Sequence, residues 1–319
     1  MTRKAIIGMV RTAALAAALF VAGGAIPFVG AIAMLFAPVP IMIYAIGRPA
    51  AVGRAFAAVT LTSLGVLAAA GPLSMLGYAV SFGLGTLIIC YMVERESRFE
   101  MVVLVTSAAV LVLSAATALA LAGSPAALAT EARDMLSTAM ARGDQLGRSV
   151  GMGGAIEGEN RAQVVELMLE LGPALIALLC AFTVLVNLAV FWRWVGTQRL
   201  TYRLFGDLIR WSAPEWMVWP LIVTGFALFP APLRPARTIA LDGFVCVAAV
   251  YFCQGLAVAA FYLKMLSTPA AWRGLIYFFA AVQPVLTAII SAVGVFDMWV
   301  DFRRLKPPRD EAGSYSDFM

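Results

Sequence analysis

Long runs of apolar residues dominate this chain, and they limit the folds that it can adopt. Each run approaches the length of about 20 residues that an α-helix needs to cross a bilayer. Hydrophobic residues make up 62% of the 319 residues and charged residues only 13%, and the mean hydropathy is +0.91. Backbone inside lipid must satisfy its own hydrogen bonds. The sequence therefore predicts an all-α, polytopic transmembrane helical bundle.

About nine spans are predicted. They cover residues 13–26, 28–46, 55–70, 75–93, 101–122, 169–192, 216–229, 239–263 and 274–295. The second run contains Pro38 and Pro40, which should kink or unwind it, and the Gly71-Pro72 pair should form a turn between two spans. Eight spans plus one re-entrant segment is an alternative, with the second run as the candidate.

Polarity divides the chain into four predicted regions. A five-span membrane region (1–123) precedes a polar extracytoplasmic loop (124–166), in which Ser124-Pro125 should start one helix. A four-span region (167–304) follows, and a disordered tail (305–319) ends the chain. The polar loop is interpreted either as a lid over an outward-facing site or as a tolerated insertion.

A basic amphipathic helix is predicted within the four-span region, at 197–211. Leucines recur every four residues there, while Arg199, Arg203 and Arg210 share the opposite face. A helix of this kind lies in the membrane interface. It would bind anionic lipid, or it would contact a cytoplasmic or membrane partner.

The formal net charge of +5 is explained by Lys and Arg in the short loops, so a nucleic-acid partner is not expected. The positive-inside rule indicates a multi-pass protein of the bacterial inner (cytoplasmic) membrane with its N-terminus in the cytoplasm. A cleaved signal peptide is the alternative for the first run. Nine spans would put the tail outside, whereas Arg303 and Arg304 favour the inside, and a re-entrant segment would remove this conflict.

The chain lacks the groups that common enzymes use. It has no histidine, and its four cysteines all fall within apolar runs without metal-ligand spacing. No nucleotide-binding loop, zinc-protease motif or nucleophile elbow is present. We therefore expect no catalytic residues, no metal and no cofactor, and a transporter of this kind would need a separate ATPase.

Three amides inside the apolar runs form the candidate solute site. Gln254 and Gln283 each lie ten residues from a basic loop, at Lys264 and Arg273, so both should lie about 15 Å deep, near the bilayer midplane. If their two helices are antiparallel, the amides share one level. Asn187 is shallower. The three amides would line a polar pocket for a small neutral or zwitterionic solute, or they would form interhelical hydrogen bonds.

Two further groups are candidates for contacts. Asp297, Asp301 and Arg304 share one face at the end of the last run, where they would anchor the helix at the interface or form a proton or substrate-entry site. Ala13 and Ala17 belong to a small-residue stripe on the first helix, against which another helix can pack closely.

Several short motifs resemble the YybS-like family of uncharacterised bacterial membrane proteins. They are Ala25-Ile26-Pro27-Phe28-Val29-Gly30, Ala37-Pro38-Val39-Pro40, Gly71-Pro72-Leu73, Tyr251-Phe252-Cys253-Gln254-Gly255-Leu256-Ala257 and Gly294-Val295-Phe296-Asp297-Met298-Trp299-Val300-Asp301-Phe302-Arg303. The N-terminal part of that family is similar to the substrate-binding (S) subunits of energy-coupling-factor transporters. The resemblance implies that the first-helix stripe, Ala13 to Ala18, docks a transmembrane coupling subunit. Asp242 departs from the family, which often has Asn at this position.

The resulting hypothesis is a transport-related, substrate-binding membrane subunit without its own ATPase. Its expected partners are the lipid bilayer, a small-molecule solute, a transmembrane coupling subunit and a separate ATPase. The alternative is a membrane scaffold or assembly factor that does not transport but binds partners through the basic 197–211 helix and the polar loop. A membrane-embedded enzyme is the third hypothesis, and the lack of an activated nucleophile or metal set argues against it.

Overall fold

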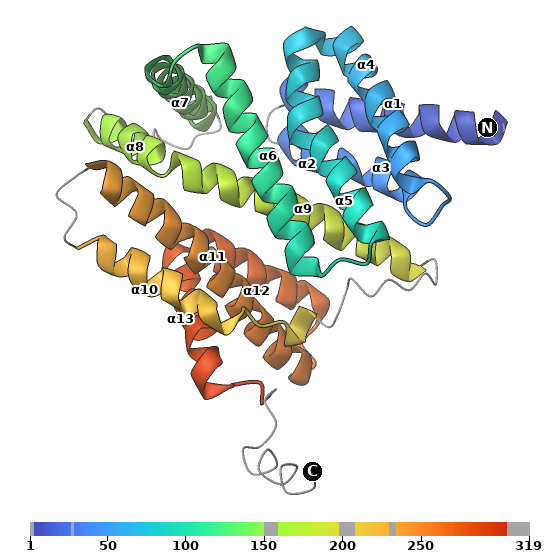
Figure 1. Ribbon diagram of the computed structural model, residues 1–319. Coiled ribbons are helices and arrows are strands. Elements are labelled where there is room, and N and C mark those ends of the chain that lie inside the picture. Colours follow the sequence, from blue (N-terminus) through green and yellow to red (C-terminus); the bar gives the residue numbers. More distant parts are fainter. Residues whose placement is uncertain (1–2, 27–28, 150–158, 198–207, 230–233, 305–319) are drawn as a thin grey trace, which may run out of the picture. The chain divides into compact units, whose positions relative to one another are not determined.

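The computed structural model describes residues 3–26, 29–149, 159–197, 208–229 and 234–304 (Figure 1). Every regular element in these ranges is helical, which confirms the predicted all-α membrane bundle. The elements are α1 (Arg3–Ala25), α2 (Val29–Leu35), α3 (Pro38–Ala45), α4 (Ala51–Tyr78), the π-helical turn η1 (Ala79–Gly83), α5 (Leu84–Glu94), α6 (Phe99–Ala122), α7 (Pro125–Ser149), α8 (Glu159–Glu170), α9 (Gly172–Thr197), the 3₁₀ turns η2 (Leu208–Arg210) and η3 (Glu215–Met217), α10 (Val218–Ala227), α11 (Arg234–Met265), α12 (Ala270–Val282) and α13 (Pro284–Val300).

The chain divides into two compact units, Met1–Phe205 and Gly206–Met319. This division differs from the predicted regions, because α9 was expected to belong with the C-terminal helices. In the structure α9 packs against α6 and α3, so it completes the N-terminal unit. The predicted tail (305–319) lies outside the described residues.

Helices α1 to α3 form the first layer of the N-terminal unit. The Tyr44 hydroxyl donates to the Ala5 carbonyl at one end, and Gly30 approaches the Ala22 backbone so closely at the other end that a side chain would collide with it. The proline-broken pair α2–α3 therefore runs antiparallel to α1 along its length. This pair, Val29–Ala45, is shorter than the helices that are long enough to cross a bilayer.

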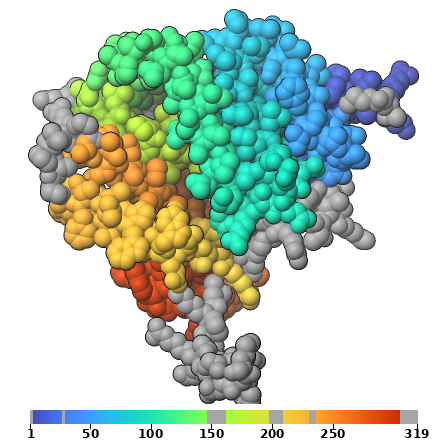
Figure 2. Space-filling view, in the orientation of Figure 1, coloured from blue at the N-terminus to red at the C-terminus, as the bar shows by residue number. Residues whose placement is uncertain are grey.

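Helix α4 contains the turn that the sequence predicted at Gly71-Pro72. Gly71 has φ 85° and ψ 178°, a conformation that suits a residue without Cβ. The chain folds back there, so Gly83 packs against Val59 and α5 runs beside the first half of α4 (Figure 1). The side chains of α4, α5 and α6 form one continuous face in the space-filling view (Figure 2).

The number of spans differs from the predicted nine. Five helical stretches are long and apolar enough to cross a bilayer, and the bent pair α12–α13 would be a sixth. One of the five is Ala51–Glu94, which folds back at Gly71. Prolines shorten the other apolar runs: α2 and α3 have 7 and 8 residues, and α10 has 10. The described helices do not confirm nine spans.

The polar loop begins as predicted. The Ala127 N–H donates to the Ser124 hydroxyl at 3.1 Å, which is the N-cap bond expected for α7. The helix continues to Ser149, and its Arg133 forms an exposed ion pair of 2.9 Å with Glu166 of α8. The two helices of the loop are thus tied to each other.

In the C-terminal unit, α13 runs parallel to α11. Gly255 of α11 lies against the Ile290 carbonyl, and farther along both helices the Tyr262 hydroxyl donates to the Phe302 carbonyl at 2.9 Å. Helix α10 is antiparallel to α11, since Thr224 of α10 packs on Gly243, whereas Ala213, which precedes α10, bonds to Gln254 farther along α11. The ends of α11 and α13 therefore lie at the same end of this unit.

The last predicted span is not a straight helix. It bends by 100° between α12 and α13, at Gln283, because Pro284 has no N–H to continue the helix. The Ala280 carbonyl, which would accept that bond, accepts instead from the Thr287 hydroxyl at 2.8 Å. The prediction that this span runs antiparallel to α11 throughout was wrong: α13, its second half, runs parallel to α11.

Candidate functional site

A buried carboxylate, guanidinium and amide form a polar network in the C-terminal unit. Arg303 and Asp297 form an ion pair of 2.7 Å, and their side chains are only 1% and 3% exposed. The Gln254 side-chain amide donates to the same Asp297 oxygen, Oδ2, at 3.1 Å. The network therefore joins the middle of α11 to the end of α13 across 43 positions of sequence.

The network also binds the backbone of the 3₁₀ turn η2 and of the residues that follow it. Arg303 Nη1 donates to the carbonyls of Ile209 and Trp211 at 2.7 and 2.9 Å. The Ala213 N–H donates to the Gln254 side-chain oxygen at 3.1 Å. Buried backbone N–H and C=O groups need hydrogen-bond partners, and these contacts supply them. The primary role of the network is therefore to hold the segment 209–213, which leads into α10, on α11 and α13.

Two polar atoms of the network have no hydrogen-bond partner among the described residues. They are Asp297 Oδ1 and Arg303 Nε, and both are buried. A buried ion pair is weak evidence for net stability, because the desolvation of its charges offsets their attraction. The pair nevertheless makes the segment and the two helices interdependent, since loss of either charge leaves the other buried and uncompensated.

Helices α11 and α13 cross with their backbones in contact beside this network. A side chain at Gly294 would collide with the Tyr251 carbonyl, and one at Gly255 would collide with the Ile290 carbonyl. Small residues permit this close approach of membrane helices. Gln254 and Asp297 lie immediately beyond the crossing, so the two glycines are what bring the amide and the carboxylate within hydrogen-bonding distance.

A pocket of about 590 Å³ lies on the other side of the crossing, between α10, α11, α12 and α13. Its lining is mostly apolar, and its polar side chains are Tyr251, Thr287 and Ser291. The lining includes Val282 and Pro284, which flank the bend of α12–α13. Its volume falls within the range of about 300–1,000 Å³ that is typical of small-molecule sites.

Tyr251 is the polar group of the pocket that the protein itself does not satisfy. Its side chain is 0% exposed, and its hydroxyl has no hydrogen-bond partner among the described residues. The other two hydroxyls donate within the protein, Thr287 to Ala280 and Ser291 to the Thr287 carbonyl. The hydroxyl has no exposed surface toward the pocket, and that of Tyr78 is equally buried without a partner among the described residues, so it does not mark a binding position.

The structure separates the two glutamines that the sequence placed at one level. Gln254 is buried in the network, whereas Gln283 is exposed at the bend and has no side-chain bond to Gln254. The expectation assumed a straight last span, and the 100° bend removes that basis. Gln283 instead lies next to two residues that line the pocket.

Asn187 lies in the N-terminal unit, where its amide donates to a carbonyl that the break between α2 and α3 leaves free. Its amide donates to the Leu35 carbonyl at 2.8 Å and to the Thr183 carbonyl at 2.7 Å. The Leu35 carbonyl is available because the chain leaves the α-helical pattern before Pro38, where Val39 N–H bonds to Phe36 instead. Asn187 is thus placed as an interhelical hydrogen-bond donor.

The end of α13 and the residues after it contribute two side chains to the network, and the sequence pattern did not single out one of them, Arg303. Asp297 is buried and paired with Arg303, whereas Arg304 is exposed. Asp301 ends α13 in the left-handed conformation, with φ 47°. The chain turns back after it, and the Arg303 side chain reaches Asp297. A helical projection cannot find Arg303, because the helix ends before it. Tyr251 was also missed, since one tyrosine in an apolar run carries no distinguishing pattern.

The remaining predicted contact residues have different surroundings. Ala13 is buried and its carbonyl is 3.5 Å from the Thr62 hydroxyl, while Ala17 faces Gly65. The small-residue stripe is therefore used within the chain, between α1 and α4. Arg210 is exposed at the end of η2. Arg199 and Arg203 lie outside the described residues.

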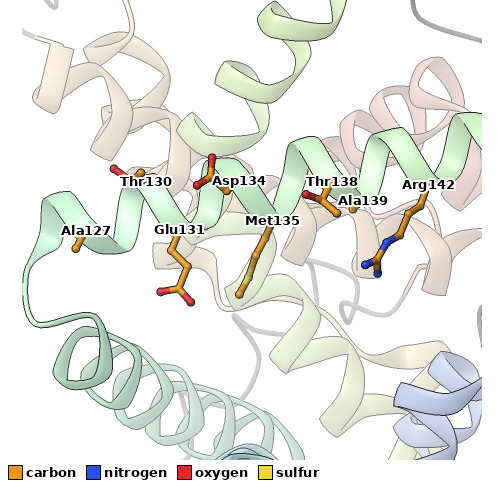
Figure 3. Close-up of a pocket in the computed structure, with 8 residues that line it drawn as sticks. All are labelled: Ala127, Thr130, Glu131, Asp134, Met135, Thr138, Ala139 and Arg142. Carbon is orange, nitrogen blue, oxygen red and sulfur yellow. The ribbon is translucent and has the colours of Figure 1, made fainter.

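A second hollow lies along α7, and its described lining comes from that helix alone. In Figure 3, Glu131, Met135 and Arg142 extend from one edge of the α7 face that lines the hollow, and Thr130 and Asp134 lie at its other edge. Because no other described element contributes to the lining, the hollow is an uncovered helix surface rather than an enclosed site. In the described ranges no three acidic or cysteine side chains converge on a metal position.

Comparison with known proteins identifies the family. The chain matches the family of predicted membrane proteins known as DUF2232 over residues 14–298, which is most of its length, and it belongs to that family. No curated protein and no solved structure matches the chain. The match extends over both units and includes Tyr251, Gln254 and Asp297.

Proposed function

We propose that this member of the DUF2232 family is a transport-related, substrate-binding membrane subunit, and that its solute occupies the pocket between α10, α11, α12 and α13. The observation that carries the proposal is the pocket itself, which has about 590 Å³ and lies at the bend of the interrupted helix α12–α13. The solute site of the initial hypothesis thereby moves from the Gln254–Gln283 pair to the other side of the α11–α13 crossing.

The bend at Gln283 supports a transport role. Membrane transporters commonly form solute sites where a helix is interrupted, since backbone that lines a cavity need not be helical. Here the interrupted helix contributes Val282 and Pro284 to the pocket lining. Most of the lining is apolar, so the proposed solute has an apolar body and few polar groups.

Energy for transport would come from other chains. The sequence contains no nucleotide-binding loop, so the proposal includes a separate ATPase and a transmembrane coupling subunit. The proposal includes the resemblance to the YybS-like family and to the S subunits of energy-coupling-factor transporters. It also includes a location in the bacterial inner membrane, with the N-terminus in the cytoplasm. Since Ala13 and Ala17 face α4, docking on α1 would use the exposed Ala14 and Ala18.

Native mass spectrometry of the full chain, purified in mild detergent, tests the proposal. We expect a retained small molecule, with its occupancy reduced by Ala288→Phe, because the larger side chain would fill part of the pocket. Ala271→Phe is the matched control, because Ala271 belongs to the same unit and does not line the pocket. Retention of no molecule by the native chain, or equal loss in both variants, would contradict a solute site in this pocket.

A membrane scaffold is the second candidate function. The uncovered surface of α7 supports it, because a partner helix could lie along Glu131 and Met135 (Figure 3). The basic segment with Arg199, Arg203 and Arg210 would be a second contact. Replacing these three arginines with Glu should then remove a partner that co-purifies with the protein, without any change in a bound solute.

A further inference from the structure

The α7 face that lines the hollow contains a row of residues at heptad spacing. Glu131, Met135, Thr138 and Arg142 are separated by four, three and four positions. Side chains at this spacing lie in one row along a helix, and such a row is the seam through which two helices of a coiled coil meet. In Figure 3, Glu131, Met135 and Arg142 extend from the helix in the same direction. We call these four residues the α7 seam.

Neither charge of the α7 seam has an ion-pair partner among the described residues. Glu131 and Arg142 are both exposed. Asp134, three positions after Glu131, carries the same charge and repels it. Between the two charges, Met135 is 63% exposed. The seam therefore presents an acidic end, an apolar centre and a basic end, and no other described element lines the hollow in front of it.

The α7 seam is complementary to itself when two copies run antiparallel. Its spacing reads the same in both directions, so a two-fold axis at its midpoint places Glu131 opposite Arg142 of a second copy, and Met135 opposite Thr138 of that copy. The two-fold axis makes two equivalent ion pairs, one at each end. A parallel pair would instead place Glu131 against Glu131 and Arg142 against Arg142, and like charges repel. The charge pattern therefore selects the antiparallel arrangement.

The direction of α7 fits such a pair within one membrane. Helix α6 is long and apolar enough to cross a bilayer. Figure 1 shows α6 along its length, whereas α7, its neighbour in the N-terminal unit, is strongly foreshortened. Helix α7 therefore runs across the direction of a spanning helix. Two copies in one bilayer are related by an axis along the bilayer normal, and helices that lie across this axis are antiparallel about it.

We propose that the α7 seam binds the same seam of a second copy, so that the protein forms a two-fold symmetric dimer in the membrane. The Glu131–Arg142 pairs set the direction and register of the contact, and Met135 is covered at its centre. The proposal assigns the uncovered face of α7 to a second copy of this chain. It is independent of the solute pocket, which belongs to the C-terminal unit.

Charge-reversal variants of the full chain in liposomes test the pairing. Self-association is measured by energy transfer between donor- and acceptor-labelled copies over a series of protein-to-lipid ratios. Glu131→Arg and Arg142→Glu should each weaken it about tenfold, because each turns two attractions into two repulsions. A mixture of the two variants should associate like the native chain, because opposite charges then meet at both ends. Arg133→Glu is the matched control, since Arg133 pairs with Glu166 instead, and it should leave association unchanged.

Cysteine cross-linking, in a chain whose four native cysteines are replaced, tests the register. Copies with Met135→Cys and copies with Thr138→Cys should form a cross-linked dimer when they are mixed and oxidised, whereas Ser137→Cys, on another face of α7, should not. Equal cross-linking through Ser137→Cys would overturn the proposal. So would a native chain that does not self-associate, charge-reversal variants that associate as the native chain does, or a mixture of them that associates no better than either alone.

Discussion

Two proline-interrupted runs, α2–α3 in the N-terminal unit and α12–α13 in the C-terminal unit, differ in their surroundings. In the N-terminal unit, α2–α3 continues alongside α1, and the freed Leu35 carbonyl receives the amide of Asn187 from α9. In the C-terminal unit, α12–α13 bends by 100°, and the freed Ala280 carbonyl receives the hydroxyl of Thr287 from its own chain segment.

The two interruptions differ in whether neighbouring side chains fill the gap that the interruption leaves. Around the first interruption, Pro38, Ile41 and Met42 are buried, and the repair comes from a distant helix that packs there. Around the second, the repair is local, Gln283 is exposed, and a pocket remains beside it. An interrupted membrane helix thus serves packing where a neighbour fills the gap. It becomes a candidate binding site where the gap is left open, as it is beside the bend of α12–α13.

The bend has the largest predicted consequence, because it decides on which side of the membrane the chain ends. Since α13 runs parallel to α11, α12–α13 should enter and leave the bilayer on one face. Single cysteines at Ser267 and Arg304, in a chain whose four native cysteines are replaced, should therefore be labelled from the same face by a membrane-impermeant maleimide. Replacements at Ser97 and Ser124, at the two ends of α6, serve as the control and should be labelled from opposite faces.

Labelling of positions 267 and 304 from opposite faces would mean that the last run crosses the membrane as one span, and that its interruption does not turn the chain back. Labelling from the same face would also place Arg303 and Arg304 together with Lys264 and Arg273, as the positive-inside rule favours.

Arg303 should contribute more to stability than the exposed charges of the chain, because it is buried and paired. Arg303→Met leaves Asp297 buried without its partner and removes the donor of the Ile209 and Trp211 carbonyls. We expect a loss of about 3–5 kcal/mol, measured as a lower Tm by tryptophan fluorescence in detergent. Arg304→Met, at the exposed neighbouring position, is the control and should have almost no effect.

The double variant Asp297→Leu with Arg303→Met sharpens this prediction. Because it removes both charges, it should recover part of the stability that Arg303→Met loses. Equal stability of Arg303→Met and Arg304→Met would show that the network does not hold the segment 209–213.

Asn187 should have a smaller effect, because its bond is uncharged. Asn187→Leu leaves the Leu35 carbonyl buried without its donor, and we expect a loss of about 1–3 kcal/mol in the same Tm measurement. Gln283→Leu is the matched amide control, since Gln283 is exposed at the other interruption, and it should change stability by less than about 0.5 kcal/mol. A larger effect of Gln283→Leu than of Asn187→Leu would reverse the comparison.

The sequence by itself determined the helical membrane class, the turn at Gly71-Pro72, the interruption at Pro38 and Pro40, and the N-cap at Ser124. These features follow from local properties: the length of an apolar run, the φ that glycine permits and the N–H that proline lacks. The same local reasoning selected Gln254 and Asp297 as unusual polar groups, because a polar side chain in an apolar run is visible without knowledge of its partner.

Only the tertiary structure decided which polar groups meet. Gln254 and Asp297 are 43 residues apart, and Arg303 reaches Ile209 across 94. Such pairs depend on the direction in which α13 returns beside α11, and a bend of 100° at one residue changes that direction completely. Proline predicts that a helix is interrupted, but packing decides whether the interruption continues as one pass or turns back. For that reason the sequence indicated a glutamine pair at one level, whereas in the structure Gln254 is buried beside Asp297 and Gln283 is exposed at the bend.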